Sequence, residues 1–128
     1  MERGKDMEVW HHGSNLRLTV LRAGSTVTKN KALAEAFSHR PSVLCMEDSG
    51  GIVHNGREAG FLYCIDEPAE EGRDVYPHPR SSMEAGLEFL TTRPLRLRLI
   101  ETVPPPSGVE AEAAKRTIKE RLRAQNKT

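Results

Sequence analysis

The chain contains 128 residues, of which 37% are hydrophobic and 29% are charged, and its formal net charge is +1. This length fits one domain with a modest core, and the nearly balanced charge gives no whole-chain argument for binding nucleic acid or an anionic membrane. No apolar run approaches the roughly 20 residues that a membrane span needs, and the opening MERGKDMEVW lacks the apolar segment of a secretory signal.

The N-terminal part of the chain predicts extended structure. Residues 7–12, MEVWHH, are expected to form a first strand that ends at Gly13. The segment 16–24 alternates only in part between apolar and polar residues, and it fits either a strand or an extended loop. Both segments precede the first helical pattern.

A helix is predicted over residues 31–40, KALAEAFSHR, because its apolar residues recur at helical spacing. Thr28 or Asn30 is expected to be its N-cap, and Pro41 ends it. From there the period changes, and residues 42–46, SVLCM, predict a short strand.

The middle of the chain predicts a hairpin, a strong strand and a long loop. A turn is expected at DSGG, residues 48–51, and the Asn-Gly pair within HNG, residues 54–56, favours a hairpin. GFLYCID, residues 60–66, is the clearest strand. The charged segment 67–82 contains three prolines and is predicted to be a loop.

The C-terminal part predicts strands followed by a helix. LEFLTT, residues 87–92, and the alternating PLRLRLIETV, residues 94–103, are read as strands. A proline-rich stop then leads into an amphipathic helix over 109–127, with Val109, Ala113, Ile118 and Leu122 as its apolar stripe. This order predicts an α+β fold in which helices flank an antiparallel or mixed sheet. The predicted organisation is one domain over 1–103, followed by a Pro-rich linker and a charged helix over 104–128.

His12 is the first candidate for chemistry. At a strand end, followed by Gly13 and Ser14, it would present an imidazole beside accessible backbone groups, which suits an amide and a ribose hydroxyl. A hydrogen-bonded structural histidine is the simpler interpretation. His11 is expected to point to the opposite face of a regular strand and to stay outside such a site.

Glu88 is the second candidate, because it precedes an apolar strand after the long loop. A carboxylate there could stabilise positive charge that develops in a transition state. The simpler interpretation is a solvated glutamate, and Glu84 is a nearby rival.

Other familiar sites are not supported by the sequence. The histidines and cysteines lack zinc-binding spacing, and no dinucleotide-binding or phosphate-binding glycine motif occurs. Cys45 and Cys64 lie in apolar runs and are interpreted as buried thiols on neighbouring strands, which favours a reducing, cytoplasmic location. A basic face of Arg93, Arg96 and Arg98, with Arg80 nearby, fits either phosphate contacts or the solvated side of an edge strand.

Three motifs in this order resemble the ADP-ribosyltransferase superfamily, in its His-Tyr-Glu branch of diphtheria-toxin-like and poly-ADP-ribose-polymerase-like enzymes. VWHHGS resembles the first-strand motif, and STVTKNKALAEAFS resembles the second motif, a strand end that leads into a helix. LEFLTTRPLRLRLIETV resembles the third motif, a glutamate-led strand, and its end is also similar to the last strand of small rifamycin-modifying ADP-ribosyltransferases. The resemblance covers roughly residues 8 to 103.

The resemblance implies an NAD site in a cleft of a split β-sheet. His12 would bind the adenosine-side ribose, and the backbone of Gly13, with Ser14 in the same motif, would hold the nicotinamide carboxamide. Glu88 would bind the nicotinamide-ribose hydroxyl and stabilise the cation that forms as nicotinamide leaves.

The second motif departs from the family at both of its two tyrosine positions. Thr28 and Phe37 occupy those positions here. Phe37 can stack on nicotinamide, whereas Thr28 cannot, and Tyr63 is a candidate to compensate.

The expected function is therefore transfer of ADP-ribose from NAD to a small molecule, a protein or a nucleic acid. One alternative is an NAD-dependent removal of a 2′-phosphate from RNA, which the arginines favour. Another is an inactive domain of the same fold that serves in protein interaction. In each case the C-terminal helix is a candidate contact with a partner or a second copy.

Overall fold

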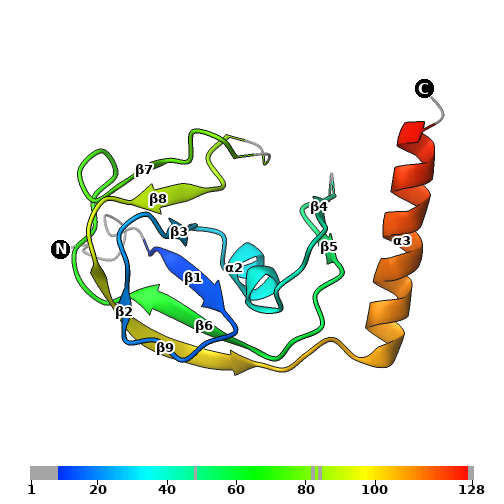
Figure 1. Cartoon of the computed structure of the whole chain (residues 1–128), viewed down its shortest axis with the longest axis horizontal. Coiled ribbons are helices and arrows are strands. Elements are labelled where there is room, and N and C mark those ends of the chain that lie inside the picture. Colours follow the sequence, from blue (N-terminus) through cyan, green and yellow to red (C-terminus); the bar gives the residue numbers. More distant parts are fainter. Residues whose placement is uncertain (1–8, 48, 82, 84, 127–128) are drawn as a thin grey trace.

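The computed structural model describes residues 9–47, 49–81, 83 and 85–126, and its fold is α+β, as predicted. Two helices and nine strands form the described part of the chain, and every strand pair in its three sheets is antiparallel. Figure 1 shows the two larger sheets curving around a shared interior, while helix α3 stands at the opposite end of the molecule. None of the helices in the described part is long and apolar enough to cross a bilayer.

The largest sheet has four strands in the order β1-β6-β9-β2. These are β1 (His11–Ser14), β6 (Gly60–Ile65), β9 (Leu95–Val103) and β2 (Val20–Leu21). Strand β6 is central and largely buried, which explains why its sequence is apolar almost throughout rather than alternating.

Two of these strands differ from the sequence prediction. Strand β1 continues through Gly13 to Ser14, and residues 7 and 8 of the predicted strand lie outside the described residues. Strand β9 contains a bulge opposite Leu62 and Tyr63, where the register skips Ile100. The bulge interrupts the clean alternation predicted for this strand.

A second sheet has the order β3-β8-β7 and is joined to the first at one point. It consists of β3 (Thr26–Val27), β8 (Phe89–Thr91) and β7 (Val75–Pro77). The residue after β3, Thr28, pairs with His11 of β1 through two backbone hydrogen bonds of 2.7 and 3.0 Å. Strand β7 lies within the segment predicted to be a loop, so that prediction was wrong at this point.

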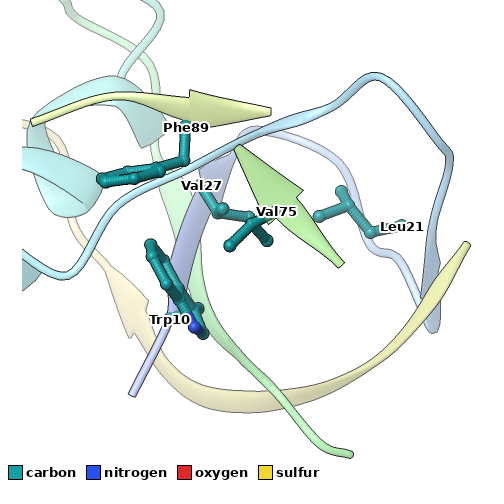
Figure 2. Packing of buried hydrophobic residues seen from close by; sticks show 5 residues of the cluster. All are labelled: Trp10, Leu21, Val27, Val75 and Phe89. Carbon is teal, nitrogen blue, oxygen red and sulfur yellow. The ribbon is translucent and has the colours of Figure 1, made fainter. Parts of the chain in front are cut away.

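The main apolar core lies between these two sheets. Trp10, the only tryptophan, packs edge-on against Phe89 with 4.8 Å between the ring centroids. Figure 2 shows Trp10 and Phe89 with Leu21, Val27 and Val75, which come from both sheets. Burial of these side chains is the main driving force that closes the sheets on one another.

Helix α2 (Lys31–Ser38) lies against β1 and β6 and is capped as its sequence predicts. Asn30 is the N-cap, and its side-chain oxygen accepts a hydrogen bond from the Leu33 N–H at 3.0 Å. Leu33 and Ala34, both in this helix, are completely buried.

A small hairpin of β4 (Leu44–Met46) and β5 (Ile52–His54) follows α2. The chain reverses between these two strands, whereas the Asn-Gly pair predicted to form a hairpin comes after β5 and joins no paired strands. Asn55 instead accepts hydrogen bonds from the backbone N–H groups of Ser42 and Val43, both at 2.9 Å. Its turn-forming side chain thus closes the base of the β4–β5 hairpin.

Helix α3 (Gly108–Asn126) packs mainly against β5 and contradicts most of the predicted apolar stripe. Ile118 is buried, but Val109 is 82% exposed and Leu122 is 50% exposed. Arg121 also pairs with Glu47 at 2.6 Å. Of the four residues of the predicted stripe, only Ile118 is therefore buried.

The two cysteines are free thiols and do not lie on neighbouring strands. Cys64 is buried in β6, as predicted, whereas Cys45 is only half-buried in the separate β4–β5 sheet.

Candidate functional site

A cavity of about 140 Å³ lies where the two larger sheets meet helix α2. Val27 pairs with Phe89 across β3 and β8, so Glu88, one residue before Phe89, comes next to Thr28 at the end of β3. Thr28 in turn pairs with His11 of β1. The cavity is lined by His11, His12, Gly13, Thr26, Val27, Thr28, Ala34, Phe37 and Glu88.

His12 is half-buried and its imidazole has a defined orientation. Its Nδ1 lies 2.7 Å from the carbonyl oxygen of Thr26, which can only accept a hydrogen bond. Nδ1 therefore carries the proton, and Nε2 of the neutral ring is an acceptor. Burial lowers the pKa of His12 below its ordinary value of 6.5, against an opposing contribution from the Thr26 carbonyl. Nε2 of the neutral ring can therefore accept a hydrogen bond from the hydroxyl group of a ligand.

His11 lines the same cavity, contrary to the expectation that it would point away. It is buried, and in the described structure its Nδ1 has no hydrogen-bond partner. Burial, followed by the positive charge of Lys31, lowers the pKa of His11. The alternation rule failed because β1 has only four residues and His11 lies at the joint between the sheets.

Gly13 has a structural reason to be glycine. A Cβ atom at this position would lie 1.7 Å from the carbonyl oxygen of Ala34 and 2.9 Å from the Ser38 nitrogen. The bare backbone that the sequence suggested for a ligand is therefore used, on that side, by helix α2. This close approach brings Ala34 and Phe37 of the helix to the cavity.

Glu88 is half-buried and is held by a neighbouring side chain. The Ser81 hydroxyl donates a hydrogen bond to its Oε1 atom, and the Met83 N–H donates to the Ser81 oxygen at 3.0 Å. The backbone carbonyl of Glu88 also accepts from the His78 N–H at 3.0 Å, beside the paired strands β7 and β8. The carboxylate is thus fixed at the cavity wall, whereas the rival Glu84 lies outside the described residues.

Thr28 and Phe37 both line the cavity, but only Phe37 offers a ring. Thr28 is buried, and its hydroxyl oxygen accepts a hydrogen bond from the Asn30 N–H at 3.0 Å. Its side chain therefore shapes the start of α2. Phe37 is half-buried and supplies an aromatic wall.

Ser14 and Tyr63 do not line the cavity, so the structure does not bring these two predicted residues to the site. The Tyr63 hydroxyl donates to the Leu16 carbonyl and accepts from the Leu18 N–H, both at 2.8 Å. Ser14 accepts from the Leu16 N–H at 3.0 Å. Both residues therefore hold the loop after β1, and Tyr63 lies outside the cavity that Thr28 lines.

No protein-family model matches the chain, and neither a curated protein nor a solved structure matches it.

The predicted basic face is engaged by acidic residues. Arg93 pairs with Asp74 at 2.9 Å and with Glu67 at 3.0 Å. Arg96 donates from its backbone N–H to Glu67 at 2.6 Å and from its guanidinium to the Asp66 carbonyl at 2.9 Å. These contacts give Arg93 and Arg96 a structural role. Within the described ranges, no three His, Cys, Asp or Glu residues gather so that they could hold a metal ion.

The cavity brings together three kinds of chemical group. It combines a neutral imidazole acceptor from His12, a fixed carboxylate from Glu88, and apolar walls from Val27, Ala34 and Phe37. Such a set suits a flat ring with an attached hydroxyl-bearing sugar, particularly one on which positive charge develops. Ser81 is the residue that sequence reasoning missed, and no local pattern identifies it as the partner of Glu88.

Proposed function

We propose that the chain is an NAD-dependent ADP-ribosyltransferase. One observation carries the proposal: five residues chosen from three separate motifs line one small cavity. They are His12 and Gly13 from β1, Thr28 and Phe37 around the start and end of α2, and Glu88 before β8. Nothing in the spacing of these segments along the chain requires them to meet, so their convergence supports the resemblance that selected them.

The size and lining of the cavity suit one part of NAD. A volume of about 140 Å³ is below the range typical for whole drug-sized ligands, and fits a single ring with part of its sugar. Phe37 would stack on the nicotinamide ring. His12 Nε2 would accept a hydrogen bond from a hydroxyl of the nicotinamide ribose, in place of the adenosine-side ribose that the resemblance implies, because His12 lines the cavity that holds the nicotinamide half. The remaining part of the dinucleotide would lie outside the cavity.

Glu88 would provide the catalytic effect. When the bond between nicotinamide and ribose breaks, the bonding electrons leave with nicotinamide and positive charge develops on the ribose ring. A fixed carboxylate next to this ring stabilises that charge more in the transition state than in bound NAD. Because Ser81 already orients Glu88, little reorganisation is needed as the charge forms.

The test measures nicotinamide released from NAD by the full chain. We expect Glu88→Gln to reduce release by about 100-fold or more while NAD binding, measured by calorimetry, is retained. Glu112→Gln, an exposed position on α3, is the matched control and should leave release unchanged. Equal turnover by Glu88→Gln would exclude the assigned role.

The contacts of Arg93 and Arg96 weaken the support for the RNA 2′-phosphotransferase alternative. Arg93 and Arg96, which suggested phosphate contacts, are bound to the acidic segment before β7. This alternative predicts 2′-phosphate release from RNA in the presence of NAD, and an assay for that product tests it directly.

An inactive interaction domain is favoured by one observation, the exposed apolar side chains of α3. Val109 and Leu122 are 82% and 50% exposed, and either could contact a partner or a second copy. This alternative predicts no heat of NAD binding. Binding of NAD followed by nicotinamide release would exclude it.

A further inference from the structure

A cavity of about 510 Å³ lies between helix α3 and strand β5, which pack side by side (Figure 1). A smaller cavity of about 180 Å³ adjoins it, and the two share His54 of β5 and Ala111 of α3 as walls. Among the described residues, neither shares a lining residue with the cavity proposed for NAD. We propose that these two cavities, which we call the α3 site, bind a small phosphate monoester with a flat apolar body.

The smaller cavity offers two positive charges to a ligand. Arg57, shortly after β5, and Lys115 of α3 both line it, and both side chains are exposed. Within the described ranges neither forms an ion pair, whereas Arg121 of the same helix is held by Glu47 at 2.6 Å. The described lining of this cavity contains no Asp or Glu. An anion there is therefore attracted by two cations and meets no carboxylate in the cavity wall.

His54 adds a hydrogen-bond donor at the junction of the two cavities. Its Nδ1 accepts a hydrogen bond from the Gly56 N–H at 3.0 Å, so the neutral ring carries its proton on Nε2. Burial, followed by the charge of His39, lowers the pKa of His54 and favours this neutral form. Nε2 has no hydrogen-bond partner in the part of the chain that the structure describes, so its N–H can donate to a ligand.

These three groups match a phosphate monoester better than a carboxylate. A phosphate monoester carries a charge of about −1.5 to −2 at neutral pH and has three terminal oxygens that accept hydrogen bonds. Arg57 supplies a planar fork of donors, Lys115 a compact charge, and His54 a single N–H. A carboxylate has one charge and two oxygens, so it neutralises the two cations less completely.

The larger cavity would hold the apolar body of the ligand. Its walls include Ile52, Val53 and the proline segment 104–106. The imidazole rings of His39 and His54 also line it, stacked with 5.3 Å between their centroids and 12° between their planes. A volume of about 510 Å³ falls within the range of small-molecule sites, whereas about 180 Å³ suits a single charged group.

The charges along α3 give the ligand one orientation. Glu110 is the only carboxylate among the described residues that line the larger cavity. It lies in the first turn of α3, and its Oε1 accepts a hydrogen bond from the Ser107 N–H at 2.9 Å. Lys115 follows more than one helical turn later. The phosphate group is therefore expected beside Lys115, away from Glu110.

Four probes separate the contributions of the charge and the ring: phenyl phosphate, benzoate, phenol and inorganic phosphate. We expect phenyl phosphate to bind the full chain at least about fivefold more tightly than any of the other three. The NMR signals of the His54 ring, followed at constant ionic strength, measure each affinity. Absence of phenyl phosphate binding, or equally tight binding of benzoate, phenol or inorganic phosphate, would overturn the proposal.

Removal of single charges locates the phosphate group. We expect Arg57→Gln and Lys115→Gln each to weaken phenyl phosphate binding about three- to tenfold. Arg116→Gln removes the same charge from an exposed position of α3 that lines neither cavity, and it is the matched control. All three side chains are exposed, so folding should be retained. An equal loss in Arg116→Gln, or no loss in the other two variants, would show that the site is not the one described.

Contacts of the phenyl ring distinguish the α3 site from the cavity proposed for NAD. Nuclear Overhauser effects are expected between the phenyl protons and the methyl groups of Ile52, while the signals of the His12 ring stay unchanged. Perturbation of His12 in place of Ile52 would put the compound in the other cavity and exclude the α3 site. Tighter binding of a 5′-phosphorylated oligoribonucleotide than of phenyl phosphate would contradict a small-molecule ligand. Every readout is of binding alone, so each outcome is independent of whether the chain cleaves NAD.

Discussion

Arg93 Nε lies 2.9 Å from Asp74 Oδ1, and this pair fastens the connection between β8 and β9 to the start of β7. Asp74 is buried, and its other carboxylate oxygen accepts from the Glu70 N–H at 2.8 Å and pairs with Arg73 at 3.0 Å. Strand β7 pairs with β8, which follows Glu88 directly. The acidic segment before β7 thus supports the strand that carries the proposed catalytic carboxylate.

We expect Asp74→Asn to lower the free energy of unfolding by about 1–3 kcal/mol, because it removes the charge from several hydrogen bonds made by a buried group. Denaturant unfolding followed by the fluorescence of Trp10 measures this change. Asp66→Asn is the control, since Asp66 is exposed and its contact with Arg98 is 3.9 Å long. An equal effect of both substitutions would contradict the structural role of Asp74.

The same carboxylate predicts an acid-sensitive fold. The Glu70 N–H first, and then the Arg73 and Arg93 guanidinium groups, lower the pKa of Asp74 from 3.8 to about 2. A lowered pKa means that Asp74 contributes its stability above 3.8, and that this contribution is lost as the pH falls from 3.8 through 2. Unfolding measured over this range should show a steeper loss of stability in the natural chain than in Asp74→Asn.

Gly13→Ala should destabilise the fold by about 1–3 kcal/mol or more, because the new methyl group meets the backbone of Ala34, which cannot rotate away. Gly51→Ala is the matched control, since the nearest atom to a Cβ there is 3.6 Å away. Thermal unfolding of the two variants measures the difference. A Gly13→Ala variant as stable as Gly51→Ala would show that α2 does not pack as closely on β1 as described.

The His12 imidazole should titrate below 6.5 in the folded chain, because burial opposes its charged form. The unfolded chain then takes up the proton first, so this histidine lowers stability as the pH falls below 6.5. NMR titration of the ring measures the pKa, and unfolding of His12→Gln between pH 7 and about 5 should show a weaker pH dependence. A His12 pKa above 6.5 would contradict the neutral tautomer assigned to it.

Ser81→Ala should reduce kcat for nicotinamide release about 10-fold to 100-fold with little change in KM, because Ser81 positions Glu88 and does not itself bind NAD. Ser81→Thr keeps the hydroxyl and should restore most of the rate. Ser107→Ala, which removes the cap of α3 far from the cavity, is the control. A rise in KM with unchanged kcat would assign Ser81 to binding instead.

The helix and the longest strands were predictable because their signals are local. Asn30 provides a capping side chain at the required spacing before Leu33, and β6 is recognisable from its continuous apolar run. Strand β7 was missed because its three residues are held by pairing with β8, and a loop-like sequence with prolines hides this non-local contact. The Asn55-Gly56 pair was predicted to form the turn of a hairpin, and this was wrong because the Asn55 side chain instead binds the base of the β4–β5 hairpin.

The candidate site was predictable only as a set of motifs. His12, Phe37 and Glu88 were selected by resemblance, and the structure brings them to one cavity. Tyr63 was expected at the site, but its hydroxyl contacts the backbone of Leu16 and Leu18 instead. The sequence of a buried strand does not show which neighbouring segment a tyrosine hydroxyl will contact. Ser81 could not be found, because its contact with Glu88 depends on how the chain folds back before β8.

The order of the four-stranded sheet has a consequence for how the protein is made. In β1-β6-β9-β2 no two neighbouring strands are consecutive in the chain, and β1 must find β6 across about 50 residues. We therefore expect slow refolding, limited by the closure of long loops rather than by local hairpins. During synthesis the apolar GFLYCI segment leaves the ribosome well before β9, its second partner. Aggregation of this incompletely paired chain, rather than instability of the native protein, is then expected to limit the yield of folded protein. A lower expression rate, which lowers the concentration of such chains, should raise that yield.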